Sequence, residues 1–574
     1  MAHRAHLFSL KFGHGLRTAL AAGPYTKTRF LSDTLAGITV GVIAIPLAMA
    51  LAIASGVAPQ YGLYTAIVAG LLIPLAGGSR YSVSGPTAAF VVILYPVAQQ
   101  YGLAGLLVAT VIAGCMMVIM ALLRLGRYIE YIPEPVTLGF TGGIAVVIAT
   151  LQLKDFLGLQ GLAMPAHFSD KVVVLFQAAP GFSSWALLVG MLTLAVMLLW
   201  PRLKTLIPAH LPAVIVGGTA AYLFNNQGAD IATIGSTFNY VLGDGVAGQG
   251  IPPVLPDFQW PWLRNQPGEA ALQWDWRVAQ DLLTAGFAIA MLGAIESLLC
   301  AVVLDRSTGT KHSANSELLG QGLGNIVAPF FGGITATAAI ARSAANLRAG
   351  AQTPIAAMIH ALVVLSALLF LAPLLAYLPM ASMAALLLVV AWKMSEAPRI
   401  LQLLKTAPRS DIAVFAVCFS LTVLFDMVIA ISAGIVLASL LFMKEIAEMT
   451  RVSDISRNRK VVDREISERW SVLKINGPLF FAAADRLFAE LAMQCTDRDG
   501  VVLYLDGVSI LDSGGVSELY KFLETCRAAG TVVYLADLQF QPLKTLSRAG
   551  FKPDGVHCRM FPTLAEALEA VATA

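Results

Sequence analysis

Apolar runs of about 20 residues recur along most of this 574-residue sequence, and each is long enough to cross the hydrocarbon core of a bilayer as a helix. The chain is 57% hydrophobic and only 13% charged, a balance that water-soluble domains do not need. Residues 1–32 are basic and rich in histidine, and they precede the first run. We expect them to be a retained cytoplasmic segment, because a secretory signal would place its apolar core earlier. The sequence therefore predicts a polytopic helical membrane protein.

Fourteen candidate spans can be counted, in two sets of seven. They lie near residues 33–54, 58–76, 84–100, 103–123, 132–151, 183–200 and 208–224, and near 281–303, 314–331, 336–348, 353–372, 375–393, 411–426 and 428–447. Basic residues gather in alternate connections, whereas the long connection 225–280 is mostly acidic. This is the pattern of positive charge on the cytoplasmic side, and it predicts an inner-membrane protein with both termini in the cytoplasm. The transmembrane domain is expected at 33–450, with repeat one at about 33–225 and repeat two at about 281–447.

The two sets share one unusual segment. "PLAGGSRYSVSGPTAAF" from Pro74 and "PFFGGITATAAIARSAA" from Pro329 both have Pro-x-x-Gly-Gly followed by small and hydroxyl residues. Seven spans is an odd number, so the second set begins on the opposite face and the repeat is inverted. Non-helical backbone is tolerated at membrane depth only where it is buried or lines a cavity. We expect each copy to enter extended and then to begin a short helix, so that two helix N-termini meet as an anion site.

The second copy contains an arginine, Arg342, where the same offset in the first copy gives Thr87. A charge at membrane depth is costly and marks a functional site, so we predict that Arg342 is the fixed cation of the anion site. The alternative is a side chain that extends to the lipid headgroups at a membrane face. Glu296 lies in the apolar run 281–303 and has several open roles. It is the countercharge of Arg342, the group that carries a coupling proton or binds sodium, or half of a structural ion pair.

Signals for enzymatic or cofactor chemistry are weak. The six cysteines and eight histidines show no metal-ligand spacing, and we expect no metal and no cofactor. "GQGLGN" from Gly320 matches a loose glycine fingerprint but follows no strand, and close packing of helices explains it better. We find no catalytic constellation, so an enzyme has no support, and we expect no nucleic acid as a partner.

The composition changes after Arg451, where charged residues and short β-like runs replace the apolar spans. We predict a cytoplasmic α/β domain at 455–574, with helices on one face of the sheet. "LDSGG" places Asp512 and Ser513 where a strand meets a helix, and we interpret Ser513 as a capping residue. The alternative is a regulatory, phosphorylated serine. We interpret the domain as a regulatory or docking module with an unknown cytoplasmic protein partner.

Four motifs together resemble the SulP (sulfate permease) anion transporters with a C-terminal STAS domain. They are "GVAPQYGLYTA", "GGSRYSVSGPTAAF", "GQGLGNIVAPFFGGITATAAIARSA" and "LDSGG". The resemblance implies the fourteen-span, seven-plus-seven inverted fold of the uracil permease type, and a homodimer in the lipid membrane. It also implies a substrate site and a coupling or charge partner, and possible regulatory residues in the STAS domain. Carried over by position, the substrate contacts are Leu47, Leu51, Thr87, Ala88, Ala341, Arg342 and Ser343, the coupling or charge partner is Glu296, and the STAS residues are Asp512 and Ser513.

Two of these positions depart from the pattern of many relatives. Leu47 follows Pro46 where animal members have Gln, and Ala341 stands where relatives have Ser. Within the family, the segments 35–159 and 293–350 are most similar to bacterial members that take up succinate, fumarate and aspartate. We therefore expect import of C4-dicarboxylates by proton symport. Sulfate or bicarbonate uptake coupled to sodium, an anion channel, and a membrane anchor for STAS signalling are the alternatives.

Overall fold

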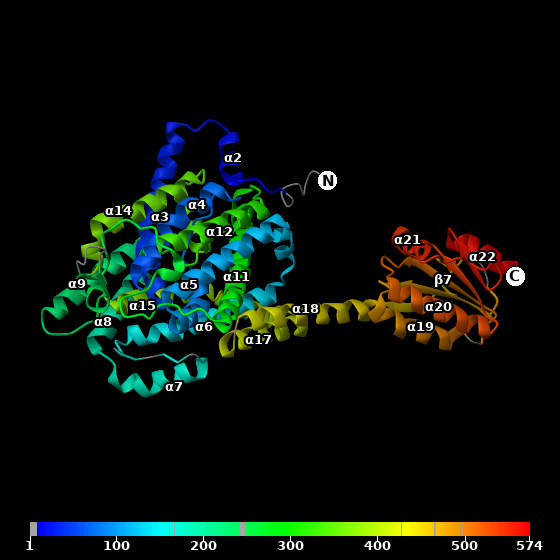
Figure 1. The fold of residues 1–574 in the computed structure, drawn as a ribbon. Coiled ribbons are helices and arrows are strands. Elements are labelled where there is room, and N and C mark those ends of the chain that lie inside the picture. The colour runs from blue at the N-terminus through cyan, green and yellow to red at the C-terminus, as the bar shows by residue number, and fades with distance from the viewer. Residues whose placement is uncertain are drawn as a thin grey trace. The chain divides into compact units, whose positions relative to one another are not determined.

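The structure is a computed structural model, and it describes residues 9–159, 161–162, 164–165, 167–203, 205, 207–241, 247–425, 427–463, 466–495 and 497–573. The chain divides into two compact units, Met1–Ile435 and Val436–Ala574. The first is built from helices, and the second contains a five-stranded sheet with helices (Figure 1). Each unit is described by itself.

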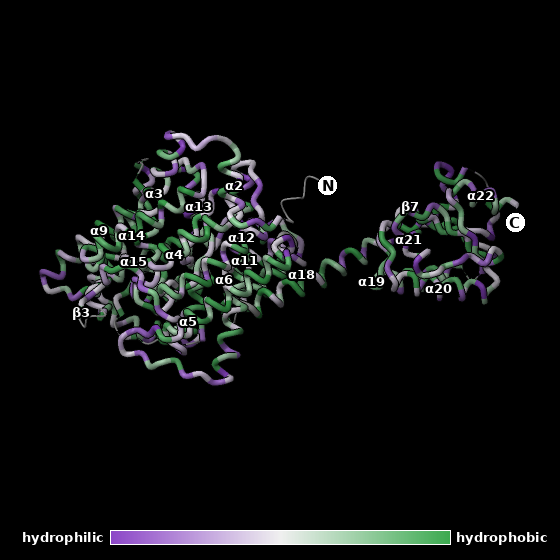
Figure 2. The backbone as a smooth tube through the Cα atoms, turned by 45° about the horizontal axis from the view of Figure 1, so that its top comes forward, coloured by the Kyte–Doolittle hydropathy of each residue, from purple (hydrophilic) through white to green (hydrophobic). Residues whose placement is uncertain are grey.

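Nine helical segments of the described residues are long and apolar enough to span a membrane. They contain α3 (Lys27–Ala54), α4 (Pro59–Ala76), α5 (Val91–Leu122), α6 (Glu134–Phe156), α8 (Ser184–Leu199), α11 (Trp276–Thr308), α14 (Ile355–Leu375), α15 (Met380–Met394) and α18 (Met427–Met449). Shorter helices occupy the other predicted spans, and these are α9 (His210–Asn225), α12 (Ala314–Val327), α13 (Ile340–Arg348) and α17 (Arg409–Leu424). Figure 2 shows that these helices are largely hydrophobic and that hydrophilic segments concentrate in the connections.

Small elements join the spans. They are α2 (His14–Ala21), β1 (Ser84–Gly85), η2 (Ala88–Phe90), η3 (Leu125–Tyr131), η4 (Ala179–Gly181), η5 (Trp200–Leu203), α10 (Ile234–Thr237), β2 (Asn239–Val241), β3 (Ala247–Gln249), η6 (Pro261–Leu263), η7 (Ala328–Phe331) and β4 (Thr337–Ala338). Strands β2 and β3 form an antiparallel hairpin within the long connection before α11. The sequence indicated only a polar loop there.

The boundary between the spans expected at 84–100 and 103–123 is confirmed, because α5 consists of two helices that meet at Gly102 (φ 64, ψ −168), where the backbone is not helical. Two features differ from the predicted spans. The first span begins at Lys27, six residues before the expected start, behind the N-cap residue Thr26. Two amphipathic helices, α7 (Phe168–Ala178) and α16 (Ala397–Thr406), were missed because neither is apolar enough to resemble a span. They follow α6 and α15, the fifth spans of the two repeats, so they occupy equivalent positions.

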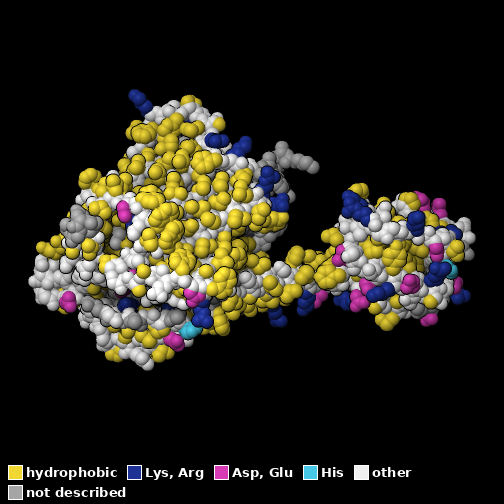
Figure 3. All heavy atoms as spheres, in the orientation of Figure 1, with side chains coloured by type: hydrophobic (Ala, Val, Ile, Leu, Met, Phe, Trp, Pro, Cys, Tyr) yellow, Lys and Arg dark blue, Asp and Glu magenta, His cyan; other side chains and the backbone are white. Residues whose placement is uncertain are grey.

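Small residues allow the helices of the first unit to approach closely. A Cβ atom on Gly322 of α12 would lie 2.8 Å from the carbonyl oxygen of Gly114 in α5, and one on Gly320 would lie 2.6 Å from Cα of Gly77. The "GQGLGN" segment thus serves helix packing, as predicted. Hydrophobic side chains cover the visible face of this unit (Figure 3), and Phe370 of α14 is 79% exposed. A surface of this kind is suited to lipid rather than to water.

The sheet of the second unit has the order β5-β6-β7-β8-β9. The strands are β5 (Arg451–Asp454), β6 (Trp470–Asn476), β7 (Gly500–Gly507), β8 (Val532–Ala536) and β9 (Cys558–Phe561), and the helices are α19 (Phe481–Cys495), α20 (Ser513–Ala528), α21 (Phe540–Arg548) and α22 (Leu564–Ala572). Strand β5 is antiparallel to β6, and the remaining neighbours are parallel.

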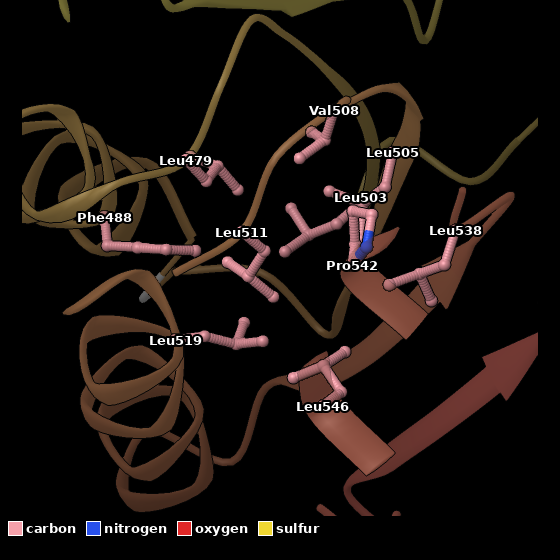
Figure 4. A pocket seen from close by; sticks show the side chains of 10 residues that line it. All are labelled: Leu479, Phe488, Leu503, Leu505, Val508, Leu511, Leu519, Leu538, Pro542 and Leu546. Carbon is pink, nitrogen blue, oxygen red and sulfur yellow. The ribbon is translucent and has the colours of Figure 1, made fainter. Parts of the chain in front are cut away.

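Both faces of this sheet are covered, so the expectation of helices on one face is wrong. Val501 and Leu503 point into a core shared with α19, α20 and α21, whereas Val502 points into a second core with α22. Successive residues of a strand face opposite sides, and parallel strands with apolar residues on both sides need cover on both. A small apolar cavity of about 10 Å³ remains in the first core, lined by residues that include Leu479, Leu511 and Leu546 (Figure 4). Its apolar lining offers water no polar partner, so it is a packing defect rather than a ligand site.

Candidate functional site

The two Gly-Gly segments meet inside the first unit. Strand β1 pairs antiparallel with β4, with Ser84 opposite Ala338 and Gly85 opposite Thr337, and both strands are buried. Backbone that would be costly at membrane depth is thereby hydrogen-bonded to the equivalent backbone of the other repeat. Helical structure starts directly after each strand, at Ala88 of η2 and at Ile340 of α13. The predicted extended entries followed by helix N-termini are therefore present, and the strand pairing brings the two starts together.

Arg342 lies in the first turn of α13 and points to the backbone of the other repeat. Its side chain is 4% exposed, and Nη2 donates a hydrogen bond to the carbonyl oxygen of Pro86 at 2.5 Å. A Cβ atom on Gly85 would lie 2.7 Å from Nη1. Nη1 is buried without a hydrogen-bond partner among the described residues. These contacts argue against a side chain that extends to the headgroups, and they leave one arm of the guanidinium fork for a ligand.

Thr87 and Glu296 form the second contact of the site. Thr87 precedes η2, and its Oγ1 donates to Oε2 of Glu296 in α11 at 3.0 Å. In the part of the chain that the structure describes, no direct ion pair joins Glu296 to Arg342, but the two opposite charges attract each other, so the countercharge role of Glu296 stays a prediction. This hydrogen bond holds a protonatable group, the carboxylate of Glu296, beside the start of η2.

The other predicted contacts have different surroundings. Leu47 and Leu51 are buried on α3, which packs against α13 and α15, and Ala88 is buried at the start of η2. Ala341 is exposed, so the first turn of α13 borders open space. Ser343 is fully buried, and its Oγ accepts a hydrogen bond from the Val83 amide at 2.9 Å. Ser343 therefore holds the extended segment, while its role toward a substrate stays a prediction.

The sequence analysis missed a polar support behind the strands. Glu317 of α12 is buried, and its Oε2 accepts from the amides of Gly78 and Ser79 at 2.9 and 2.8 Å. Gln321 donates from Nε2 to Ser84 Oγ at 3.0 Å. Asn325 binds both backbone groups of Ala336, accepting its N–H at 2.8 Å and donating to its oxygen at 2.8 Å. The available signal was three polar residues at helical spacing within the expected span 314–331.

In the second unit, Asp512 rather than Ser513 caps helix α20. Oδ1 of Asp512 accepts from the Gly515 amide at 2.8 Å, and Oδ2 accepts from the Phe481 amide at 3.1 Å. Ser513 is the first helical residue and is exposed, so the expectation that it caps the helix is wrong. An aspartate one residue earlier already satisfies the free amides. A regulatory role for Asp512 and Ser513 stays a prediction.

Within the described residues, no cluster of three or more His, Cys, Asp or Glu side chains is arranged to hold a metal ion. The arrangement of Arg342, Thr87 and Glu296 offers a cation, a hydroxyl and a carboxylate around two helix starts. That set can bind a small anion and exchange a proton or a cation beside it.

Comparison with known proteins agrees with this architecture. The sulfate permease family matches residues 30–418, and the STAS domain matches residues 461–567. The putative sulfate transporter YvdB of Bacillus subtilis is 38% identical over 527 residues, which are 92% of this chain and 95% of that protein. The bicarbonate transporter BicA of Picosynechococcus is 28% identical over 484 residues, which are 80% of each chain.

Two solved structures share the fold. The inward-facing murine Slc26a9 anion transporter aligns with a TM-score of 0.82 at 18% identity, covering 98% of this chain and 94% of that one. The transmembrane domain of a cyanobacterial BicA aligns with a TM-score of 0.60 at 27% identity, covering 71% of this chain and 98% of that one. The chain therefore belongs to the sulfate permease (SulP) family, and it is an anion transporter, not an enzyme, with a seven-plus-seven inverted repeat and a C-terminal STAS domain.

Proposed function

We propose that the protein is a secondary active transporter that carries a small dianion between the two half-helices, α13 and the part of η2–α5 before Gly102. The observation that carries this proposal is the buried Nη1 of Arg342, which has no hydrogen-bond partner within the described residues. A buried cation with an unused donor is costly, and an anion that completes the guanidinium fork removes that cost. The two helix N-termini add positive potential at the same place.

The substrate class that we place first is a C4-dicarboxylate of the succinate, fumarate or aspartate type. Leu47 and Leu51 are buried on α3, a helix that packs against α13, and apolar side chains suit a carbon backbone better than a compact oxyanion. A terminal carboxylate matches the planar donors of Arg342. Uptake is driven by protons, with Glu296 as the protonatable partner, because its carboxylate is held by Thr87 at the helix start.

The second candidate is sulfate or bicarbonate uptake coupled to sodium. The observation that favours it is the pair of relatives described as a putative sulfate transporter and a bicarbonate transporter. The carboxylate of Glu296 and the hydroxyl of Thr87 are oxygen ligands of the kind that hard cations bind. Under this second proposal, Glu296 and Thr87 bind the sodium ion and Arg342 binds the anion.

Purified full-length protein in liposomes separates these candidates. Labelled succinate, sulfate and bicarbonate are each offered under an inward proton gradient, an inward sodium gradient, and neither. We expect saturable succinate uptake that the proton gradient accelerates and that unlabelled fumarate competes for. Sodium-dependent uptake of sulfate or bicarbonate without succinate uptake would contradict the dicarboxylate proposal. Anion currents that do not saturate with anion concentration would favour a channel over a carrier.

We also propose the arrangement in the cell. Residues 1–32 and the STAS domain at 455–574 lie in the cytoplasm, and the transmembrane domain at 33–450 crosses the inner membrane as a homodimer. The distribution of basic residues between connections supports this orientation. The STAS domain docks a cytoplasmic protein. Reporter fusions to each terminus test the orientation, and cross-linking in membranes tests the dimer.

A further inference from the structure

The two half-helices end in the same way. The first half of α5 stops at Gly102 (φ 64), and α13 is followed by Gly350 (φ 96). Glycine adopts this backbone conformation without steric cost, so each helix can turn sharply into the next span. At both turns, the first backbone amides of the following segment donate to a carboxylate from elsewhere in the sequence. The Gln352 amide donates to Asp33 Oδ1 at 2.7 Å, and the Leu103 amide donates to Glu269 Oε2 at 3.1 Å.

Asp33 is the more strongly bound of the two carboxylates. It is fully buried, and it also accepts from the Thr353 amide at 3.1 Å, the Thr353 hydroxyl at 2.6 Å and the Tyr25 hydroxyl at 3.0 Å. Burial and the neighbouring Asp33 carboxylate raise the pKa of Tyr25 to about 12, so this phenol remains a donor at any physiological pH. Next to Asp33, Ser32 donates to the carbonyl oxygen of Gly350 at 2.6 Å.

Glu269 ties the equivalent turn to a second helix. Its Oε2 also accepts from the Gln266 amide at 2.9 Å, and its Oε1 accepts from Gln266 Nε2 at 2.8 Å. Oε1 of Gln266 in turn accepts from the amide of Ala58, the N-cap residue of α4, at 2.8 Å. The chain before α11 therefore links the start of α4 to the end of the first half-helix.

The two contacts cross between the repeats. Asp33 lies in α3 of repeat one and holds the turn after α13 of repeat two, whereas Glu269 lies in the connection that enters repeat two and holds the turn inside α5 of repeat one. Seven crossings separate the start of α3 from the start of α11, so the two contacts lie at opposite membrane faces. Helix α13 has only nine residues, so its two ends lie close together and the position of its C-terminal end constrains the position of its N-terminus.

We propose that Asp33 and Glu269 are positioning residues that each fix the far end of the other repeat's half-helix and thereby place its N-terminus at the anion site. This inference rests on the proposed function of that site. A carboxylate that accepts backbone amides is a strong, directional anchor. Asp33 lies near the start of α3, where the chain enters repeat one, and Glu269 lies in the connection before α11, where the chain enters repeat two. Each contact therefore links the position of a half-helix to a segment at the membrane surface.

The test compares four full-length variants in liposomes with the unaltered protein. Asp33→Asn and Glu269→Gln replace each anchor with a near-isosteric amide, which removes the negative charge and leaves one acceptor oxygen instead of two. Glu396→Gln and Asp275→Asn are matched controls, because Glu396 pairs with the exposed Arg399 and Asp275 is an exposed cap of α11. Hydrogen–deuterium exchange is followed in peptides covering 88–103 and 340–353, together with KM and Vmax for the transported anion.

We expect Asp33→Asn to accelerate exchange in 340–353 and to leave 88–103 unchanged, and Glu269→Gln to do the reverse. The loss of a charge-assisted hydrogen bond is expected to raise KM about tenfold with little change in Vmax. The two controls should match the unaltered protein in both measurements. Thr353→Val removes a single donor to Asp33 and should give a smaller change in 340–353, which keeps the test available if Asp33→Asn does not fold.

Uniformly faster exchange in both peptides with an unchanged KM would assign the carboxylates a general structural role and overturn the proposal. Unchanged exchange in 340–353 after both Asp33→Asn and Thr353→Val would overturn it as well. The exchange measurement needs no substrate. If the unaltered protein transported none of the offered anions, the proposed function would fail while the anchoring of the half-helices would still be decided.

Discussion

At the scale of single residues, the two arginines of α13 differ in burial and in their contacts. Arg342 is buried against the Pro86 carbonyl, whereas Arg348 is exposed in the last turn, where its Nε donates to the Ala344 oxygen at 3.3 Å. A buried cation with an unused donor is a binding group, and an exposed one at a helix C-terminus stabilises the helix. The pair therefore provides an internal comparison for the role of charge.

We expect Arg342→Ala to abolish saturable anion uptake, a loss of at least about a hundredfold, because the anion loses a charged hydrogen-bond donor in a desolvated site. Arg342→Lys should recover only a fraction, since an ammonium group cannot reproduce the planar fork. Arg348→Ala is the control and should transport normally. Uptake kinetics are measured in liposomes at equal protein content. Normal kinetics in Arg342→Ala would remove this residue from the site.

Glu296→Gln tests coupling separately from binding. The amide can still accept the Thr87 hydroxyl, so the local structure should persist, but it carries no exchangeable charge. We expect the variant to lose accumulation driven by a proton gradient and to retain exchange of labelled for unlabelled anion. Counterflow and gradient-driven uptake are measured on the same preparation. Accumulation that still follows the proton gradient would assign the coupling to another group.

The buried thiols of the STAS domain provide a test based on pKa. Burial raises the pKa of Cys495 to about 11 and the pKa values of Cys526 and Cys558 to about 12. Only the thiolate reacts with iodoacetamide, so these groups should resist alkylation at pH 8 in the folded protein and react after denaturation. Mass spectrometry of digested full-length protein measures the modified fraction. Rapid modification under native conditions would mean that this domain opens readily.

At the scale of elements, the site depends on the pairing of β1 with β4 and on the absence of a side chain at Gly85. Gly85 of β1 lies directly against the guanidinium of Arg342, and its extended backbone would accept any residue. The strands bring the helix starts together because each one satisfies the backbone of the other. Anion affinity should therefore respond to changes in the strand as well as to loss of the arginine, because the strand fixes where the guanidinium lies.

Gly85→Ala introduces a Cβ atom that would lie 2.7 Å from Nη1 of Arg342, well inside van der Waals contact. The end of a long side chain can move, so we expect a stability change of less than about 1 kcal/mol. The displaced guanidinium should nevertheless raise KM severalfold. Gly181→Ala is the control, since a Cβ there meets open space. Thermal unfolding and uptake are measured together, and an unchanged KM would show that the guanidinium position is not limiting.

At the scale of the whole molecule, the transporter and the STAS domain have separate hydrophobic cores. The STAS cores are built from β6–β9 and their own helices, and the chain divides within α18. We therefore expect a protein truncated after residue 454 to keep saturable uptake in liposomes, with a KM close to that of the full chain. Complete loss of uptake by a folded, truncated protein would favour the view that transport and STAS signalling are inseparable.

Much of this architecture follows from local patterns. The apolar runs indicated the spans because a lipid environment demands long apolar helices, and the paired Gly-Gly segments indicated the broken helices because extended backbone must be buried. The amphipathic helices α7 and α16 escaped detection, since at 11 and 10 residues each is too short to resemble a membrane span. The position of α22 on the second face of the sheet was not predicted, because an alternating pattern does not reveal which helix covers which side.

The candidate site, too, was predicted only in part from the sequence. Arg342 and Glu296 stood out in the sequence because charged residues are rare at membrane depth, and Thr87 was identified as the residue at the same offset in the first Gly-Gly segment. Both signals are properties of the sequence itself. The partners of these residues were decided only by the tertiary structure. The Thr87–Glu296 contact joins two side chains that are 209 positions apart in the sequence. The contacts of Arg342 with the Pro86 carbonyl, and of Asp33 and Glu269 with amides, involve backbone groups that every residue except proline possesses in full. A donor or acceptor common to all residues leaves no mark in a sequence, so only the folded chain can assign it.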